Sequence, residues 1–264
     1  MPFVTVGAQR LEYALIPARD AAAPTLILLH EGLGSLALWR DFPARLAQAT
    51  GASVLVYSRL GYGKSTPLTQ KRRVDYMHVE ALEVLPALRD ALAIAEPVLV
   101  GHSDGASIAL LHAGAGCWPV RGLVLEAPHV FVEDVTVTSI EAAREAYATS
   151  ELRSRLARYH ADVDGAFRGW NDIWLDPDFR SWNIESCLAG VSCPTLVIQG
   201  ADDEYGTPAQ LDAITATIGG PVETLLLLDC KHSPHRDQPD VTLAAMTRFI
   251  AGAKSSPLPL AGEG

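Results

Sequence analysis

The distribution of apolar residues along the chain predicts alternating strands and helices. Short, continuous apolar runs recur, with longer stretches of mixed polarity between them. A strand that is apolar on both sides belongs to a parallel sheet covered by helices on each face. Six such runs are present, at residues 25–30, 53–58, 97–102, 122–128, 194–200 and 223–229. The alternation predicts an α/β fold.

Two more strands and one crossover helix extend this pattern. Residues 4–17 alternate polar and apolar side chains around Gly7, which predicts an antiparallel hairpin at the edge of the sheet. Residues 74–95 repeat apolar side chains at three- and four-residue steps, as an amphipathic helix does. We therefore expect a mostly parallel, eight-stranded sheet with helices on both faces.

The rhythm stops between residues 129 and 188. Some sixty residues there contain no apolar run of the strand type, but they hold three tryptophans among many charged residues. We expect a helical cap inserted after the sixth strand, so that residues 1–128 and 189–252 form the core domain. Residues 253–264 are small, Pro-rich and without periodicity, which predicts a disordered tail.

Composition excludes several classes of partner. The chain has 21 Lys and Arg residues against 31 Asp and Glu, and a formal charge of −10 disfavours nucleic acid. No apolar run approaches the roughly 20 residues that cross a bilayer, so no membrane association is expected. The four cysteines show neither metal spacing nor a C-x-x-C pair, and no apolar leader begins the chain. We expect a cytoplasmic protein with reduced thiols and a small-molecule substrate; the sequence leaves its oligomeric state open.

A nucleophile motif lies directly after the predicted strand 97–102. Residues 101–105 read Gly-His-Ser-Asp-Gly, which matches G-x-S-x-G, and a helix-compatible segment follows. A sharp strand-to-helix turn of this type presents the serine hydroxyl above the sheet. Because a serine hydroxyl is a weak nucleophile, Ser103 needs a histidine to accept its proton and a carboxylate to orient that histidine.

Three adjacent acids could supply the carboxylate. Asp202, Asp203 and Glu204 follow the predicted strand 194–200, at the carboxyl edge where sites of open α/β sheets form. Their order after Ser103 is the one expected of this fold, and the residues alone leave the choice among them open.

The loop after the last predicted strand supplies the base. It contains His232 and His235, and His232 is favoured because it is nearer the end of the strand. His235 suits a surface or supporting position equally well. Five other histidines are far from this loop in sequence, and we expect structural roles for them: His30, His78, His112, His129 and His160.

An oxyanion hole requires two backbone N–H groups directed at the developing charge. Asp104, the residue after the nucleophile, is expected to provide one of them. The other is expected from the loop 31–34 that follows the strand 25–30.

Several segments together resemble the α/β-hydrolase superfamily, and the resemblance covers nearly all of residues 1–252. They read HEGLGS at 30–35, RLGYGKS at 59–65, GHSDG at 101–105, PTLVIQGADDEYGTP at 194–208 and DCKHSPHRDQP at 229–239. The resemblance implies the α/β-hydrolase fold and selects Asp203 as acid and His232 as base. It also implies Gly32 as the second oxyanion donor, with Leu33 as the fallback.

The expected cap resembles those of haloalkane dehalogenases, epoxide hydrolases and carbon–carbon bond hydrolases. The first two branches carry an aspartate at the elbow, so Ser103 excludes their alkyl-enzyme chemistry. The resemblance implies that Trp170 and Trp174 contact substrate, with packing against the core as the alternative.

These residues predict a serine hydrolase that cleaves a small carboxylic ester through an acyl-enzyme, without metal or cofactor. Asp104 and Glu31 would place negative charge near the acyl pocket and favour neutral or cationic acyl groups. Asp104 also resembles the substrate-binding acid of amino-acid-ester hydrolases of the valacyclovirase type, unless its side chain is paired elsewhere in the protein. Carbon–carbon (diketone) hydrolase, amino-acid-ester hydrolase and lactonase activities use the same triad and stay open, as does a non-catalytic ligand receptor.

Overall fold

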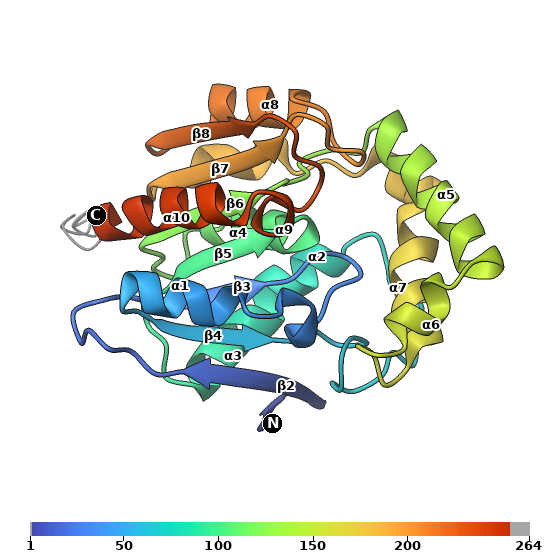
Figure 1. The fold of residues 1–264 in the computed structure, drawn as a ribbon, viewed down its shortest axis with the longest axis horizontal. Helices are drawn as coiled ribbons and strands as arrows, with labels where there is room; N and C mark the ends of the chain where they lie inside the picture. Colours follow the sequence, from blue (N-terminus) through green and yellow to red (C-terminus); the bar gives the residue numbers. More distant parts are fainter. Residues whose placement is uncertain (1, 254–264) are drawn as a thin grey trace.

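A mostly parallel sheet in the order β1-β2-β4-β3-β5-β6-β7-β8 forms the centre of the computed structural model, which describes residues 2–253 (Figure 1). Strand β2 pairs antiparallel with β1 and with β4, and all the other neighbours pair in parallel. The predicted fold class is confirmed. The strands are β1 (Phe3–Val6), β2 (Gln9–Ile16), β3 (Thr25–Leu29), β4 (Ser53–Tyr57), β5 (Val98–His102), β6 (Gly122–Glu126), β7 (Thr195–Gly200) and β8 (Val222–Leu227).

Each of the six apolar runs contains one strand, β3 to β8, and the alternating segment forms the β1–β2 hairpin. Successive side chains of a strand point to opposite faces of the sheet, and the packing follows this rule. In β3, Leu26 and Leu28 enter the core beneath α1 and α10, whereas Ile27 and Leu29 enter the core on the side of α4. Strands β3 to β7 are therefore buried, as their continuous apolar runs require. The last run is an exception, because β8 lies at the edge of the sheet and is mostly exposed or half-buried.

Helices α1 and α10 pack together on one face of the sheet, and α4 packs on the other against β3, β5 and β6. The helices are α1 (Phe42–Thr50), α2 (Tyr76–Val79), α3 (Leu85–Ala91), α4 (Asp104–Gly114), α5 (Asp134–Thr149), α6 (Leu152–Leu156), α7 (Val163–Trp174), α8 (Ala209–Thr217), α9 (Pro234–Asp237) and α10 (Pro239–Ala253). Shorter helical turns are η1 (Leu36–Trp39), η2 (Glu80–Val84), η3 (Pro177–Ser181) and η4 (Glu185–Gly190).

The helix expected at residues 74–95 is divided in the structure. It runs as α2, a π-helical turn at η2, and α3. Pro86 has no N–H to donate to the carbonyl four residues earlier, so one helical hydrogen bond is missing where η2 passes into α3. Ala93, with a φ of 54°, lies outside the right-handed helical region and ends the segment early.

Helical segments occupy the chain between β6 and β7, where the cap is expected. Figure 1 shows α5, α6 and α7 grouped beyond one end of the sheet, away from α1 and α10. Helix α7 buries Phe167, Trp170 and Trp174, which recur at helical spacing and form its inner face. The expected tail lies outside the described residues, apart from Ala253 at the end of α10. Within residues 2–253, no helix is both long enough and apolar enough to cross a membrane.

Candidate active site

The turn between β5 and α4 holds Ser103 in an unusual backbone conformation. Its φ is 54° and its ψ is −119°, a region that residues with a side chain rarely occupy. A Cβ atom at Gly105 would collide with the carbonyl oxygen of Leu29, so glycine lets the turn lie directly on β3. The predicted strand–turn–helix arrangement around Ser103 is present, with the serine at the end of β5.

Two loops bring a histidine and a carboxylate to Ser103. The Nε2 atom of His232 lies 2.9 Å from the Oγ atom of Ser103, and its Nδ1 atom lies 2.8 Å from Oδ1 of Asp203. Asp203 follows β7, and His232 follows β8, so parallel neighbours deliver both groups to the same edge of the sheet. Asp202 and Glu204 are exposed, and the Glu204 carboxylate instead accepts a hydrogen bond from the His232 backbone N–H.

The environment of Asp203 keeps its carboxylate ionised. Its side chain is only 1% exposed, and it also accepts hydrogen bonds from the Tyr205 backbone N–H and the Gln199 side-chain amide. Burial opposes ionisation, but the His232 ring and the Tyr205 N–H outweigh it and hold the pKa of Asp203 below its usual value. An ionised carboxylate at Nδ1 holds the proton on that nitrogen, which leaves Nε2 as the acceptor facing the Ser103 hydroxyl.

A cavity of about 160 Å³ opens over Ser103 and His232. Six more of the predicted site residues line it, namely Glu31, Gly32, Leu33, Asp104, Trp170 and Trp174. Asp203 does not line the cavity, because it lies behind His232. Sequence reasoning missed seven further lining residues, namely His102, His129, Thr136, Ile140, Tyr205, Ser233 and Arg236. Tyr205, Ser233 and Arg236 lie within four residues of Asp203 or His232 in sequence, and this closeness could have indicated that they line the site. Thr136 and Ile140 lie on α5, and no sequence motif indicated that they reach the cavity.

The predicted oxyanion donors lie in the wall of this cavity. Helix α4 begins at Asp104, and its first helical hydrogen bonds run from the N–H groups of Ala106 and Ser107 to the Ser103 carbonyl. The Asp104 N–H precedes these bonds and has no carbonyl of the helix to donate to. Gly32 lies beneath the indole of Trp170, and a Cβ atom at position 32 would collide with that ring. Glycine therefore allows a cap tryptophan to pack directly on the loop after β3.

The side chain of Asp104 is paired inside the protein. Its carboxylate is 1% exposed and accepts hydrogen bonds from the Tyr76 hydroxyl at 2.6 Å and the Trp174 indole N–H at 3.2 Å. The Arg59 guanidinium lies 3.8 Å away. The structure therefore favours the alternative in which this charge is balanced by the protein, not by a substrate.

Two histidines that were given no catalytic role lie close to His232. The ring of His129 is 5.6 Å from that of His232, and burial together with the charge of His232 lowers the pKa of His129 to about 3. His235 is buried, and its Nδ1 atom and backbone N–H both contact one carboxylate oxygen of Glu126, at 2.8 and 3.0 Å. The sequence allowed either a surface or a supporting position for His235, and the structure places it in the supporting position.

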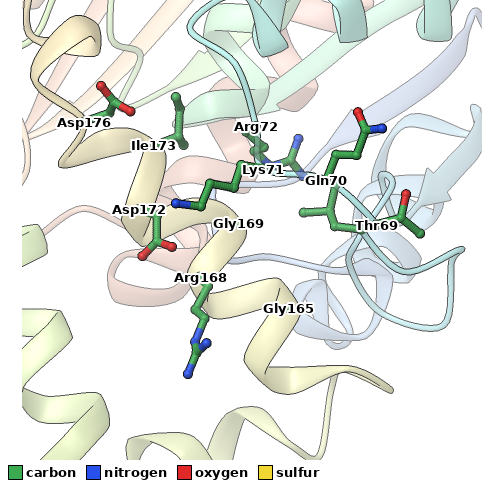
Figure 2. Close-up of a pocket in the computed structure, with 11 residues that line it drawn as sticks. Thr69, Gln70, Lys71, Arg72, Gly165, Arg168, Gly169, Asp172, Ile173 and Asp176 are labelled. Carbon is green, nitrogen blue, oxygen red and sulfur yellow. The ribbon is translucent and has the colours of Figure 1, made fainter.

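A second cavity, of about 360 Å³, lies between α7 and residues 68–72 and shares no lining residue with the first (Figure 2). It is lined by basic side chains, Lys71 and Arg168 among them, and by Asp172 and Asp176. Three basic side chains and two acidic ones therefore face this cavity. Among residues 2–253, no group of three or more histidine, cysteine or acidic side chains is arranged to hold a metal ion.

The sheet, the strained serine at the end of β5 and the adjoining histidine and acid define an α/β-hydrolase. The model of the alpha/beta hydrolase family matches residues 26–245, and the chain belongs to this family. It is therefore a hydrolase by family.

Comparison with individual proteins gives more distant similarities. The chain is 31% identical over 100 residues to a proline iminopeptidase of Lactobacillus helveticus, a match that covers 38% of this chain and 34% of that protein. It is 26% identical over 246 residues to the dihydrolipoyllysine-residue acetyltransferase component of an acetoin cleaving system of Pseudomonas putida, covering 85% of this chain and 63% of that protein. The first match thus spans about a third of the iminopeptidase, and the second spans somewhat under two thirds of the acetyltransferase component.

Solved structures share the fold at low identity. The crystal structure of proline iminopeptidase from Mycobacterium smegmatis superposes with a TM-score of 0.77 at 18% identity, over 96% of this chain and 98% of that one. An enol-lactonase from Burkholderia xenovorans superposes with a TM-score of 0.73 at 22% identity, over 95% of this chain and 100% of that one. At these identities the similarity concerns the fold.

Proposed function

We propose that this chain hydrolyses small carboxylic esters through an acyl-enzyme on Ser103, with His232 as general base and Asp203 as the acid that orients it. One observation carries the proposal. A continuous run of hydrogen bonds leads from the Ser103 hydroxyl through both ring nitrogens of His232 to the Asp203 carboxylate. This run is the proton path that activates a serine hydroxyl.

The reaction proceeds in two halves. Ser103 Oγ attacks the ester carbonyl carbon while its proton passes to His232 Nε2, and the carbonyl oxygen takes the negative charge. Backbone N–H groups of Gly32 and Asp104 stabilise that charge. The carbon–oxygen bond to the alcohol then breaks, and His232 gives its proton to the departing oxygen. Water repeats the sequence on the acyl-enzyme, releasing the acid and restoring Ser103; no cofactor takes part.

The cavity limits the size and charge of the acyl group. A volume of about 160 Å³ suits a short chain, and Trp170, Trp174, Ile140 and Leu33 give it apolar walls. Because the Asp104 carboxylate is already paired, it offers no free charge to a substrate ammonium. These features support a short, neutral acyl group over an aminoacyl group.

A substrate panel tests the proposal, with the Ser103→Ala variant as blank. The panel contains p-nitrophenyl esters of two to eight acyl carbons, a lactone, a prolyl amide, an α-amino ester with its des-amino analogue, and a meta-cleavage dienoate. We expect the two- to four-carbon esters to give the highest kcat/KM and the amino group to bring no advantage.

Labelling of Ser103 by a fluorophosphonate separates an enzyme from a ligand receptor of the same fold. We expect labelling of the unmodified chain and its loss in His232→Ala. Absence of labelling together with absence of turnover across the panel would contradict the proposal, as would equal turnover by Ser103→Ala. A clear preference for the lactone or the dienoate would identify the chain as a lactonase or a carbon–carbon bond hydrolase instead of an esterase.

A further inference from the structure

The side chain of His102 joins three loops of the site. It is the last residue of β5, is 1% exposed, and directly precedes Ser103. Its Nε2 atom lies 2.7 Å from the backbone carbonyl oxygen of His232, and its Nδ1 atom lies 3.6 Å from Oε2 of Glu31. A carbonyl oxygen only accepts hydrogen bonds, so Nε2 of His102 is protonated and donates a hydrogen bond to the backbone carbonyl of His232. One buried ring therefore connects the loop after β3, the serine turn and the loop of the base.

The surroundings of His102 favour its charged form. The Nε2 atom donates a hydrogen bond to a carbonyl oxygen, and Nδ1 lies 3.6 Å from a carboxylate oxygen, which is an ion-pair distance and not a hydrogen bond. The charge of that carboxylate favours a proton on Nδ1. Burial disfavours this charge, but Glu31 and, at longer range, Glu126 outweigh it, and the pKa of His102 is raised. Burial likewise opposes ionisation of Glu31, yet His102 holds the pKa of that carboxyl well below its usual value. The two side chains stabilise each other as an ion pair.

Other titratable groups also surround this pair. The rings of His232 and His235 lie 5.2 and 5.1 Å from the ring of His102, and their loop follows β8. His129, from the loop after β6, stays neutral because of its lowered pKa. When His232 takes the proton of Ser103, two positive rings lie side by side. The Glu31 carboxylate compensates that charge.

The placement of Glu31 argues against a role in holding substrate. Its side chain lines the cavity but is only 19% exposed, and its carboxylate folds back over Gly34 so closely that a Cβ atom there would collide with it. The backbone carbonyl of Glu31 accepts hydrogen bonds from Gly34 N–H and from the Arg59 guanidinium, which closes the loop tightly. The acid thus faces His102 from within a rigid turn.

We propose that Glu31 and His102 are positioning residues, whose ion pair locks the loop carrying Gly32 to the backbone of His232. The inference rests on the proposed function, in which Ser103 and His232 perform the chemistry. The pair keeps the oxyanion donors and the base in one geometry while the charge on His232 changes. Misplacement of reacting groups by about 1 Å costs on the order of 100-fold in rate, so such a lock acts on kcat more than on KM.

The lock has a pH dependence of its own. When His102 loses its proton, the lone pair of Nδ1 faces the Glu31 carboxylate and the two repel. We therefore expect kcat to fall at alkaline pH, as the pH rises through the raised pKa of His102. In Glu31→Gln the amide N–H donates to the neutral Nδ1, so this alkaline fall disappears while kcat at neutral pH drops roughly tenfold and KM changes less than twofold.

The experiment measures kcat and KM from pH 5 to 10 on p-nitrophenyl acetate, with Ser103→Ala as the blank at each pH. Glu141→Gln serves as the control, because Glu141 is exposed on α5 and is not among the residues that line the cavity. His102→Gln is the second variant: its amide can donate to the His232 carbonyl, yet it cannot titrate, so it also lacks the alkaline fall. Circular dichroism and thermal unfolding establish that each variant is folded.

Three results would overturn the inference. The first is an unchanged alkaline limb and unchanged kcat in Glu31→Gln. The second is an alkaline limb that persists in folded His102→Gln. The third is a rise in KM confined to an α-amino ester, which would make Glu31 a substrate-binding residue. Failure of the proposed function looks different, because the unmodified chain would then show neither turnover nor labelling of Ser103.

Discussion

Two carboxylate–histidine pairs lie at the edge of the sheet, and of these two only the Asp203–His232 pair faces Ser103. Asp203 pairs with His232 and Glu126 pairs with His235, and in each pair the Nδ1 atom is 2.8 Å from a carboxylate oxygen. Each acid follows or ends a parallel strand, and both histidines come after β8, His232 in the loop and His235 in the short helix α9. In both acids burial opposes ionisation, and the partner histidine nevertheless lowers the pKa.

The surroundings of the second ring nitrogen separate the two pairs. His232 is 13% exposed, and its Nε2 atom meets Ser103 in the cavity. The ring of His235 is 4% exposed and packs 4.6 Å from Trp39 and 5.3 Å from Phe42, in the core beneath α1. An acid and a histidine in contact therefore do not by themselves define the proposed proton path. The role of each histidine depends on what its Nε2 atom faces, which is the Ser103 hydroxyl for His232 and the packed core for His235.

Removing the two histidines gives the largest expected contrast. His232→Ala removes the base and is expected to lower kcat by roughly 10⁶-fold on the best ester of the panel. His235→Ala leaves the proton path intact, and kcat should stay within tenfold at temperatures where the variant is folded. Steady-state kinetics with parallel thermal unfolding measures both effects. A loss for His235→Ala as large as that for His232→Ala, in folded protein, would remove the distinction between the pairs.

Neutralising the two acids sharpens the same contrast. Asp203→Asn keeps the shape but no longer holds the proton on Nδ1, and kcat should fall roughly 10⁴-fold. Glu126→Gln should change kcat less than threefold. Asp202→Asn is the matched control, because that neighbouring acid is exposed and contacts neither histidine. If Asp202→Asn is the damaging change, the acid has been assigned to the wrong residue.

Stability should show the reverse order. Glu126→Ala leaves two buried donors of His235 without an acceptor, which is expected to lower the free energy of unfolding by about 3 kcal/mol. His232 borders the cavity, so Asp203→Ala should cost less. Urea unfolding at pH 7 measures both variants. Equal losses would mean that the two pairs support the fold alike.

Acid pH should affect stability through both acids. A carboxyl group whose pKa is lower in the folded state stabilises the fold above its unfolded pKa, near 4, and this contribution is lost as the pH falls through the folded pKa. The urea midpoint should therefore decrease on going from pH 6 to pH 3. Glu126→Gln removes one of the two contributions and should show a smaller decrease. An unchanged pH slope in that variant would indicate that Glu126 carries no such linkage.

The parts of the fold that sequence predicts well are contiguous. The strand, the glycine-flanked turn and the helix around Ser103 occupy neighbouring residues, so their pattern is visible without knowledge of the rest of the chain. Asp203 and His232 could be placed because each follows an apolar strand, and parallel strands end at the same edge. The division of the helix at residues 74–95 was missed because one proline interrupts an otherwise regular apolar period.

The partners of the site side chains could not be found in this way. Glu126 and His235 are 109 residues apart in sequence, and Trp174 reaches Asp104 over 70 residues. Such contacts depend on where the loops and the cap helix α7 lie after the chain has packed. The local pattern of apolar and polar residues does not determine that placement. For this reason the sequence left open whether the charge of Asp104 faces a substrate or is paired within the protein, and the structure shows that it is paired.

For this protein the sequence by itself determined the order of strands and helices, the strand–turn–helix position of Ser103 and the loops that carry Asp203 and His232. These follow from hydrophobic period and chain direction, which are local properties. Only the tertiary structure decided which partner His235 takes, which acids are already paired and how small the cavity is. Those outcomes depend on distances between distant segments, and burial and charge act through such distances.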